Sequence, residues 1–130
     1  MLPTHPGISP LTTITALKKI RALLKEDGWC TGGTTLCKPT YGHNGWCLLG
    51  ALSEVCGDYR TYVEVHSRIL RAARSFTKND SLILVDFNDY VAKDAGEILL
   101  VLRRALRYSF RYRPLPINRK PTERIQTHAS

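Results

Sequence analysis

The residues of this sequence that could do chemistry are concentrated around its cysteines and histidines. Asn44 is a residue type that caps helices, which predicts a helix from Gly45 to Cys56 with Cys47 in its first turn. Unpaired backbone N–H groups and the helix dipole favour a thiolate at that position. A cysteine-dependent hydrolase or transferase would use this thiolate as nucleophile, with a histidine base and an orienting amide or carboxylate. The candidates for these roles are Cys47, His43, His66, Asn88 and Asp89.

The same residues also have a packing interpretation. Cys47 stands between Trp46 and Leu48 and suits a small apolar site in a core. His66 falls on the apolar face of a predicted helix, as a core histidine does. We favour this interpretation, in which no residue is catalytic and the protein is not an enzyme.

Metal binding is a third use of this segment. Cys30, Cys37, His43 and Cys47 are separated by six, five and three residues, and three thiolates with one imidazole can hold a tetrahedral Zn²⁺. Structural zinc knuckles place paired sulfurs about two to four residues apart, a spacing that these cysteines lack. We therefore predict no cofactor, with zinc as the alternative. A Cys30–Cys37 disulfide is favoured less still.

Positive charge is concentrated at the C-terminal end of the sequence. Residues 1–100 hold 11 basic and 10 acidic side chains, whereas residues 101–130 hold 8 basic and 1 acidic, so 7 of the 8 net positive charges lie there. Arginine binds phosphates through its forked guanidinium, and the interleaved Tyr108, Phe110 and Tyr112 could stack on bases. The predicted polyanion-binding residues are Arg103, Arg104, Arg107, Arg111, Arg113, Arg119, Lys120 and Arg124. The competing interpretation is a solvated helix face followed by a solubilising tail.

The periodicity of apolar residues predicts the elements that must position these groups. Helices are expected over residues 13–25, 45–56 and 59–76 and from Asp94 onward, with a short extended segment at Leu82–Val85. Asp94 and Glu97 are spaced as a capping box at the start of the last helix. The fold class is therefore all-α, a compact four-helix domain with one short extended segment and a basic C-terminal tail. Its divisions are an extended lead-in over 1–12, the helical domain over 13–112 and the tail over 113–130.

The predicted core follows from the apolar stripe of each helix. Its members are Trp46, Leu49, Leu52, Ile69, Leu102 and Leu106. On the third helix we expect Arg60, Arg68, Arg71 and Arg74 to lie mostly on the opposite, solvated side.

The order of short motifs resembles that of a known family. Gly28-Trp29-Cys30 is followed by a Trp46-Cys47-x-x-Gly50-Ala51 motif and then by Phe87-Asn88-Asp89. Over residues 14–107 this order is similar to an uncharacterised family of small bacterial and phage proteins, associated with actinobacterial genomes. The resemblance implies no activity, but it groups Trp46, Cys47, Gly50, Asn88 and Asp89 in one constellation.

The sequence also bears on location. The longest apolar run is five residues, Ile98–Leu102, against about 20 for a bilayer span. Residues 1–14 lack the basic and apolar regions of a signal peptide. We therefore expect a cytoplasmic protein with reduced thiols and no membrane partner.

Together these observations favour a small non-enzymatic binding protein. Its basic last helix and tail would contact nucleic acid or an acidic protein partner. The family setting suggests an accessory role in a phage or mobile element. The alternative is the hydrolase or transferase centred on Cys47.

Overall fold

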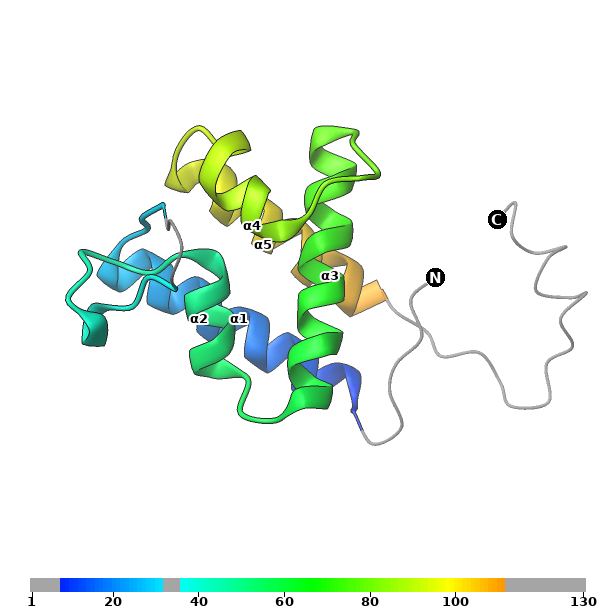
Figure 1. Cartoon of the computed structure of the whole chain (residues 1–130). Helices are drawn as coiled ribbons and strands as arrows, with labels where there is room; N and C mark the ends of the chain where they lie inside the picture. Colours follow the sequence, from blue (N-terminus) through cyan, green and yellow to red (C-terminus); the bar gives the residue numbers. More distant parts are fainter. Residues whose placement is uncertain (1–7, 32–35, 112–130) are drawn as a thin grey trace, which may run out of the picture.

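The computed structural model describes residues 8–31 and 36–111, and this part of the chain is helical without a β-strand (Figure 1). The predicted all-α class is confirmed, although the number of helices is not four. Five α-helices are present among the described residues, with one 3₁₀-helix and one π-helix. In chain order the elements are α1 (Pro10–Asp27), η1 (Pro39–Tyr41), α2 (Leu48–Val55), α3 (Tyr59–Thr77), α4 (Leu84–Asp86), η2 (Phe87–Val91) and α5 (Ala95–Arg111).

Helix α1 begins at Pro10, three residues before the predicted start and within the expected lead-in. The Ser9 hydroxyl accepts a hydrogen bond from the Thr12 N–H at 3.1 Å, and proline suits the first helical position. The helix ends at Asp27 and is followed by the cap residue Gly28, whose φ of 91° is favourable for glycine alone.

Helix α2 begins at Leu48, so the predicted start at Gly45 and the predicted cap at Asn44 are wrong. The reason is a tertiary contact. Trp46 donates its N–H to the Gly28 carbonyl at 2.9 Å and accepts from the Cys30 N–H at 3.1 Å, which holds it in an extended conformation. The N-cap is Cys47 itself.

Helix α3 starts after Asp58, whose carboxylate accepts from the Thr61 N–H at 2.8 Å. One predicted position on this helix is wrong. Arg68 was expected in solvent but its side chain is 6% exposed, and it binds Glu64, itself 2% exposed, with an Nη2–Oε2 distance of 2.8 Å. A guanidinium paired with a carboxylate one turn away can enter a core that a lone arginine cannot.

The segment between α3 and α5 is helical where an extended strand-like stretch was expected. Ile83 is extended, but Leu84 begins α4, which continues into η2. Leu84 and Phe87 are both buried, and only a helical turn puts residues three apart on one side. The predicted cap of α5 at Asp94 is confirmed, since its carboxylate accepts from the Glu97 N–H at 3.0 Å. The return bond differs from a capping box, because Glu97 accepts from the Lys93 N–H, one residue before the cap.

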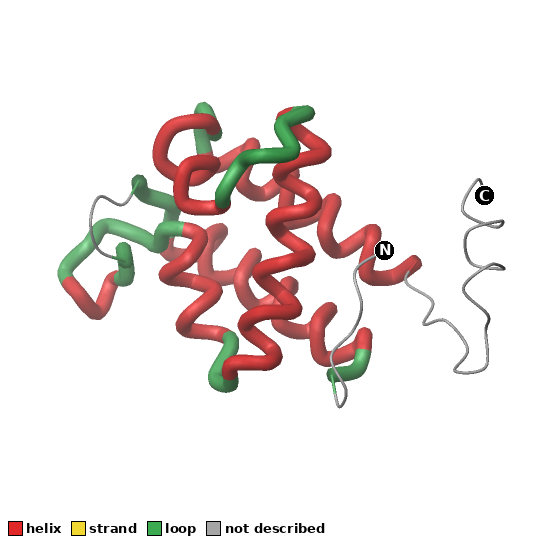
Figure 2. The backbone as a smooth tube through the Cα atoms, turned by 45° about the vertical axis from the view of Figure 1, so that its right-hand side comes forward, coloured by secondary structure: helices red, strands yellow, loops and turns green. Residues whose placement is uncertain are grey.

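Helix α5 packs against both α1 and α3, and α2 fills the space beside α1 and α3 (Figure 2). Five of the six predicted core residues are buried, Trp46, Leu52, Ile69, Leu102 and Leu106. Leu49 is only partly buried and packs against the edge of this core. The helix phases that periodicity predicts are thus right at Ile69 of α3 and at Leu102 and Leu106 of α5, whereas on α2 only Leu52 is buried as predicted.

Candidate functional site

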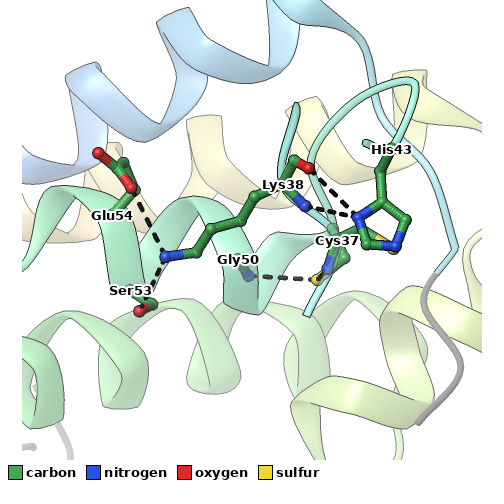
Figure 3. Close-up of polar contacts among 7 residues, drawn as sticks. Cys37, Lys38, His43, Gly50, Ser53 and Glu54 are labelled. Atoms are coloured by element: carbon green, nitrogen blue, oxygen red, sulfur yellow. Dashed lines mark hydrogen bonds and ion pairs between the residues drawn. The ribbon is translucent and has the colours of Figure 1, made fainter. Parts of the chain in front are cut away.

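Cys47 is buried at the start of α2, with 5% of its surface exposed. Its Sγ accepts two backbone hydrogen bonds, from the Cys37 N–H at 3.3 Å and from the Gly50 N–H at 3.2 Å (Figure 3). The sulfur therefore caps α2 and anchors the Cys37 segment to it.

Neither candidate base is hydrogen-bonded to Cys47 in the described part of the chain. His43 places Nδ1 at 3.2 Å from both the backbone N and the carbonyl O of Lys38 (Figure 3). His66 lies on α3 and stacks on Tyr62 with 5.9 Å between ring centroids. Burial, and then the charge of Arg74, lower the pKa of His66. The Cys-His pairing of the hydrolase hypothesis is thus not assembled in this conformation.

Asn88 joins three segments that are far apart in sequence. Its Oδ1 accepts from Trp29 Nε1 at 2.7 Å and from the Leu48 N–H at 2.9 Å. Its Nδ2 donates to the Cys30 carbonyl at 3.4 Å and to Asp89 Oδ1 at 2.7 Å. Every hydrogen-bonding position of the amide is used in holding the fold, so it does not orient a histidine.

Gly50 completes the arrangement. A methyl group at this position would overlap the carbonyl oxygen of Cys37, so only glycine lets the two segments approach this closely. The constellation of Trp46, Cys47, Gly50 and Asn88 is therefore brought together, and each contact described above is one that stabilises the fold.

The four alternative zinc ligands do not form a metal centre in the described residues, where no group of three or more potential ligands is arranged to hold an ion. The Cys37 thiol donates to the Thr31 carbonyl at 3.3 Å. Burial, followed by the neighbouring Cys30 and Cys47 thiols, raises the pKa of Cys37 to about 12. At neutral pH the Cys37 thiol is therefore protonated in the metal-free protein.

A second group of residues forms a basic surface. Arg103 and Arg107 are exposed one turn apart on α5, between Leu100 at 42% exposure and Phe110 at 58%. Arg104 leans toward α3, where its Nη1 lies 3.5 Å from the Ser75 Oγ and its guanidinium lies 5.8 Å from the Phe76 ring centre.

Helix α3 continues this surface in a hollow of about 410 Å³. The residues that line it are Ser67, Leu70, Arg71, Arg74, Ser75 and Asp80. Ser75 connects the hollow to α5, because its Oγ is within 3.5 Å of both Arg104 Nη1 and the Tyr108 hydroxyl. Arg74 is held in place by donating Nε–H to the Leu82 carbonyl at 2.9 Å.

Helix α1 borders α5 on another side, with Lys18 Nζ at 5.6 Å from the centre of the Phe110 ring. We call Lys18, Arg71, Arg74, Arg103, Arg104 and Arg107 the basic face. Sequence reasoning missed Lys18, Arg71 and Arg74, because helical periodicity does not encode which helices lie next to α5. Arg113, Arg119, Lys120 and Arg124 lie outside the described residues, as does the side chain of Arg111.

Comparison with known proteins gives one match. A family model described as a family of unknown function (DUF6197) covers residues 8–108. The chain belongs to this family. No curated protein and no solved structure matches it.

The DUF6197 match includes the whole Cys47–Asn88 constellation and α5 as far as Tyr108. It begins at the residue before the Ser9 cap and ends within the last turn of α5. None of the described helices of this DUF6197 protein combines the length and apolarity needed to cross a bilayer.

Proposed function

We propose that this DUF6197 protein is a small non-enzymatic binding protein that contacts a polyanion with its basic face. The observation that carries the proposal is the exposed pair Arg103 and Arg107 on α5, continued through Ser75 to Arg71 and Arg74 on α3. Residues 113–124 add four further basic side chains and one acidic one.

Nucleic acid is the partner that this chemistry suits first. Guanidinium groups and serine hydroxyls both bind phosphate oxygens, and the hollow on α3 supplies two of each. Phe110, exposed beside Arg107, offers a flat apolar face on which an unpaired base can stack. An acidic protein would use the same arginines but not the aromatic ring.

The hypothesis of a cysteine-dependent enzyme has less support. Its nucleophile caps a helix, and its two candidate bases bind other groups. With the binding function we keep the expectations of a cytoplasmic location and of a phage or mobile-element accessory role. Imaging of the tagged protein in its source cell tests the first, and identification of co-purifying proteins there tests the second.

A salt titration tests the binding proposal. Affinity for a labelled duplex and a labelled single strand is measured at several salt concentrations. Because arginine contacts release condensed counterions, the logarithm of affinity should fall linearly with the logarithm of salt, with a slope of about −0.9 per phosphate contact on duplex DNA. Arg103→Gln, Arg107→Gln and Arg71→Gln should each weaken binding severalfold and flatten the slope.

Lys93→Gln is the charge-matched control. Lys93 is exposed and precedes the start of α5, at the opposite end of the helix from Arg107. This variant should leave the slope unchanged. Equal effects of all four variants would mean that only net charge matters and would remove the basic face as a site. If the intact protein binds neither nucleic acid at low salt, an acidic protein becomes the better partner.

A further inference from the structure

Three cysteines that are distant in sequence lie on adjoining backbone segments. The Cys30 N–H donates to the Trp46 carbonyl at 3.1 Å, next to Cys47. The Cys47 N–H donates to the Cys37 carbonyl, also at 3.1 Å. The function proposed above does not use these thiols, so their gathering is a separate feature of the molecule.

The hydrogen bonds of the three cysteines distinguish Cys47 from Cys30 and Cys37. Cys47 Sγ is the acceptor of two backbone N–H groups and caps α2. The Cys37 S–H instead donates to the carbonyl of Thr31, the residue after Cys30, at 3.3 Å. The Cys37 sulfur therefore lies against the backbone of the residue that directly follows Cys30.

The two members of the pair differ in access. Cys37 is 3% exposed, whereas Cys30 is half-buried. Burial and the neighbouring thiols raise the pKa of Cys37 to about 12, so that this thiol is protonated at neutral pH. A small oxidant should consequently meet Cys30 first.

We propose that Cys30 and Cys37 are a peroxide-reactive pair that closes into an intramolecular disulfide. In the first step the Cys30 thiolate attacks one oxygen of hydrogen peroxide. An S–O bond forms, the O–O bond breaks, and the departing hydroxide takes a proton to become water. In the second step Cys37 loses its proton, its sulfur attacks the sulfur of the Cys30 sulfenic acid, and the S–O bond breaks to release water. Two thiols lose two electrons and two protons, and one peroxide becomes two waters.

The closed disulfide would replace the weak bond from Cys37 to Thr31 with a covalent link. Cys47 and Cys56 would stay thiols, because Cys47 is fixed by its two N–H donors and Cys56 is buried at the other end of α2. The second step requires the Cys37 thiolate, so disulfide formation should accelerate as pH rises above neutral.

The experiment treats the full-length reduced protein with hydrogen peroxide and maps its thiols. Free thiols are alkylated with iodoacetamide, the protein is reduced, and released thiols are alkylated with N-ethylmaleimide. All four cysteines fall in one tryptic peptide, residues 26–60, because Lys38 precedes proline. Fragmentation of that peptide therefore reports the four positions together. We expect loss of two hydrogens from the intact mass, with the second label on Cys30 and Cys37 alone.

Single variants separate the two steps. Cys37→Ser should stop the reaction at a Cys30 sulfenic acid that dimedone traps, and Cys30→Ser should leave Cys37 reduced. Cys56→Ser is the matched control and should form the disulfide as the parent protein does. Three results would overturn the proposal: a Cys37–Cys47 bridge, a sulfenic acid on Cys30 in the parent protein that never closes, or a bound zinc ion that protects all three thiols. The mapping of thiols in the unsubstituted protein tests the proposal even if a variant fails to fold.

Discussion

Cys47 carries a thiol that could be reactive, but in this fold its sulfur serves as a hydrogen-bond acceptor in a buried site. It accepts two backbone hydrogen bonds and is excluded from solvent, so it acts as a helix cap. Asn88 similarly connects distant segments, because its Oδ1 accepts from the Trp29 indole N–H and from the buried N–H of Leu48 at the start of α2. The contacts of Cys47 and Asn88 therefore give both motif residues a structural role.

The thiols should differ in their rates of alkylation. Cys30 should react first with iodoacetamide at neutral pH, and Cys47 no faster than Cys56, whose pKa is raised to about 11 by burial and by Asp58. Time-resolved mass spectrometry of the folded protein measures the four rates. Selective rapid labelling of Cys47 would revive the hydrolase hypothesis.

Zinc content can be measured directly in the untagged protein. We predict that no zinc remains after dialysis, because the cysteines of this sequence lack the close pairing of structural zinc knuckles. One equivalent that resists dialysis would instead make Cys30, Cys37, His43 and Cys47 its ligands.

Gly50 offers a test of the close approach at the start of α2. Gly50→Ala should lower the urea midpoint, since the added methyl overlaps the Cys37 carbonyl and such overpacking costs about 1–3 kcal/mol. Gly57→Ala is the control, because nothing lies within 4 Å of the added group, and it should change stability by less than about 0.5 kcal/mol. Equal midpoints for the two variants would show that the Cys37 segment can move away from α2 without loss of stability.

His66 predicts a pH dependence of stability. Its pKa is lowered in the folded protein by burial and by the charge of Arg74. The unfolded chain therefore takes up a proton more readily, and stability should fall as pH drops below about 6.5, the usual histidine value. His66→Gln should flatten the thermal midpoint over that range. A midpoint in the parent protein that rises on acidification there would contradict the prediction.

Among the helices, α5 connects the core to the basic face. Its buried stripe packs on α1 and α3, while Arg103 and Arg107 lie on the exposed side. The buried Glu64–Arg68 pair shows that such a division is not absolute on α3. A helix can bury an arginine where a carboxylate one turn away satisfies it.

Leu102 is the residue of α5 whose truncation should matter most clearly. It is fully buried, so Leu102→Ala should cost about 2–5 kcal/mol of unfolding free energy. Leu100→Ala on the same helix is the control, since that side chain is 42% exposed and its loss should have a small effect. Chemical denaturation measures both. A smaller cost for Leu102 than for Leu100 would mean that the helix is turned differently about its axis.

At the scale of the whole molecule, the acidic and basic side chains of α5 lie at opposite ends of the helix. Asp94 and Glu97 lie at its N-terminus and the arginines toward its C-terminus, an arrangement that also complements the helix dipole. The arginines therefore have a local stabilising role in addition to the binding proposed for them. Binding assays and stability assays on the same variants separate the two roles.

Removal of Pro114–Ser130 tests how binding is shared between domain and tail. The family match ends at residue 108, so the truncated protein should keep its thermal midpoint. It loses Arg119, Lys120 and Arg124 together with Glu123, and the salt dependence of polyanion binding should flatten by about 0.9 per lost phosphate contact on duplex DNA. An unfolded truncation, or an unchanged slope, would contradict this division.

The sequence by itself determined the features that depend on near neighbours. Apolar spacing along a helix and the capping pair Asp94 and Glu97 act within about one turn, so α3, α5 and most of the core were predictable. The tertiary structure decided the remainder. The Trp46 backbone bonds to Gly28 and Cys30 move the start of α2, and Glu64 allows Arg68 to be buried. Ser75, which lines the hollow on α3, contacts Arg104 on α5. Each of these depends on a backbone hydrogen bond or side-chain contact whose partner local periodicity does not specify.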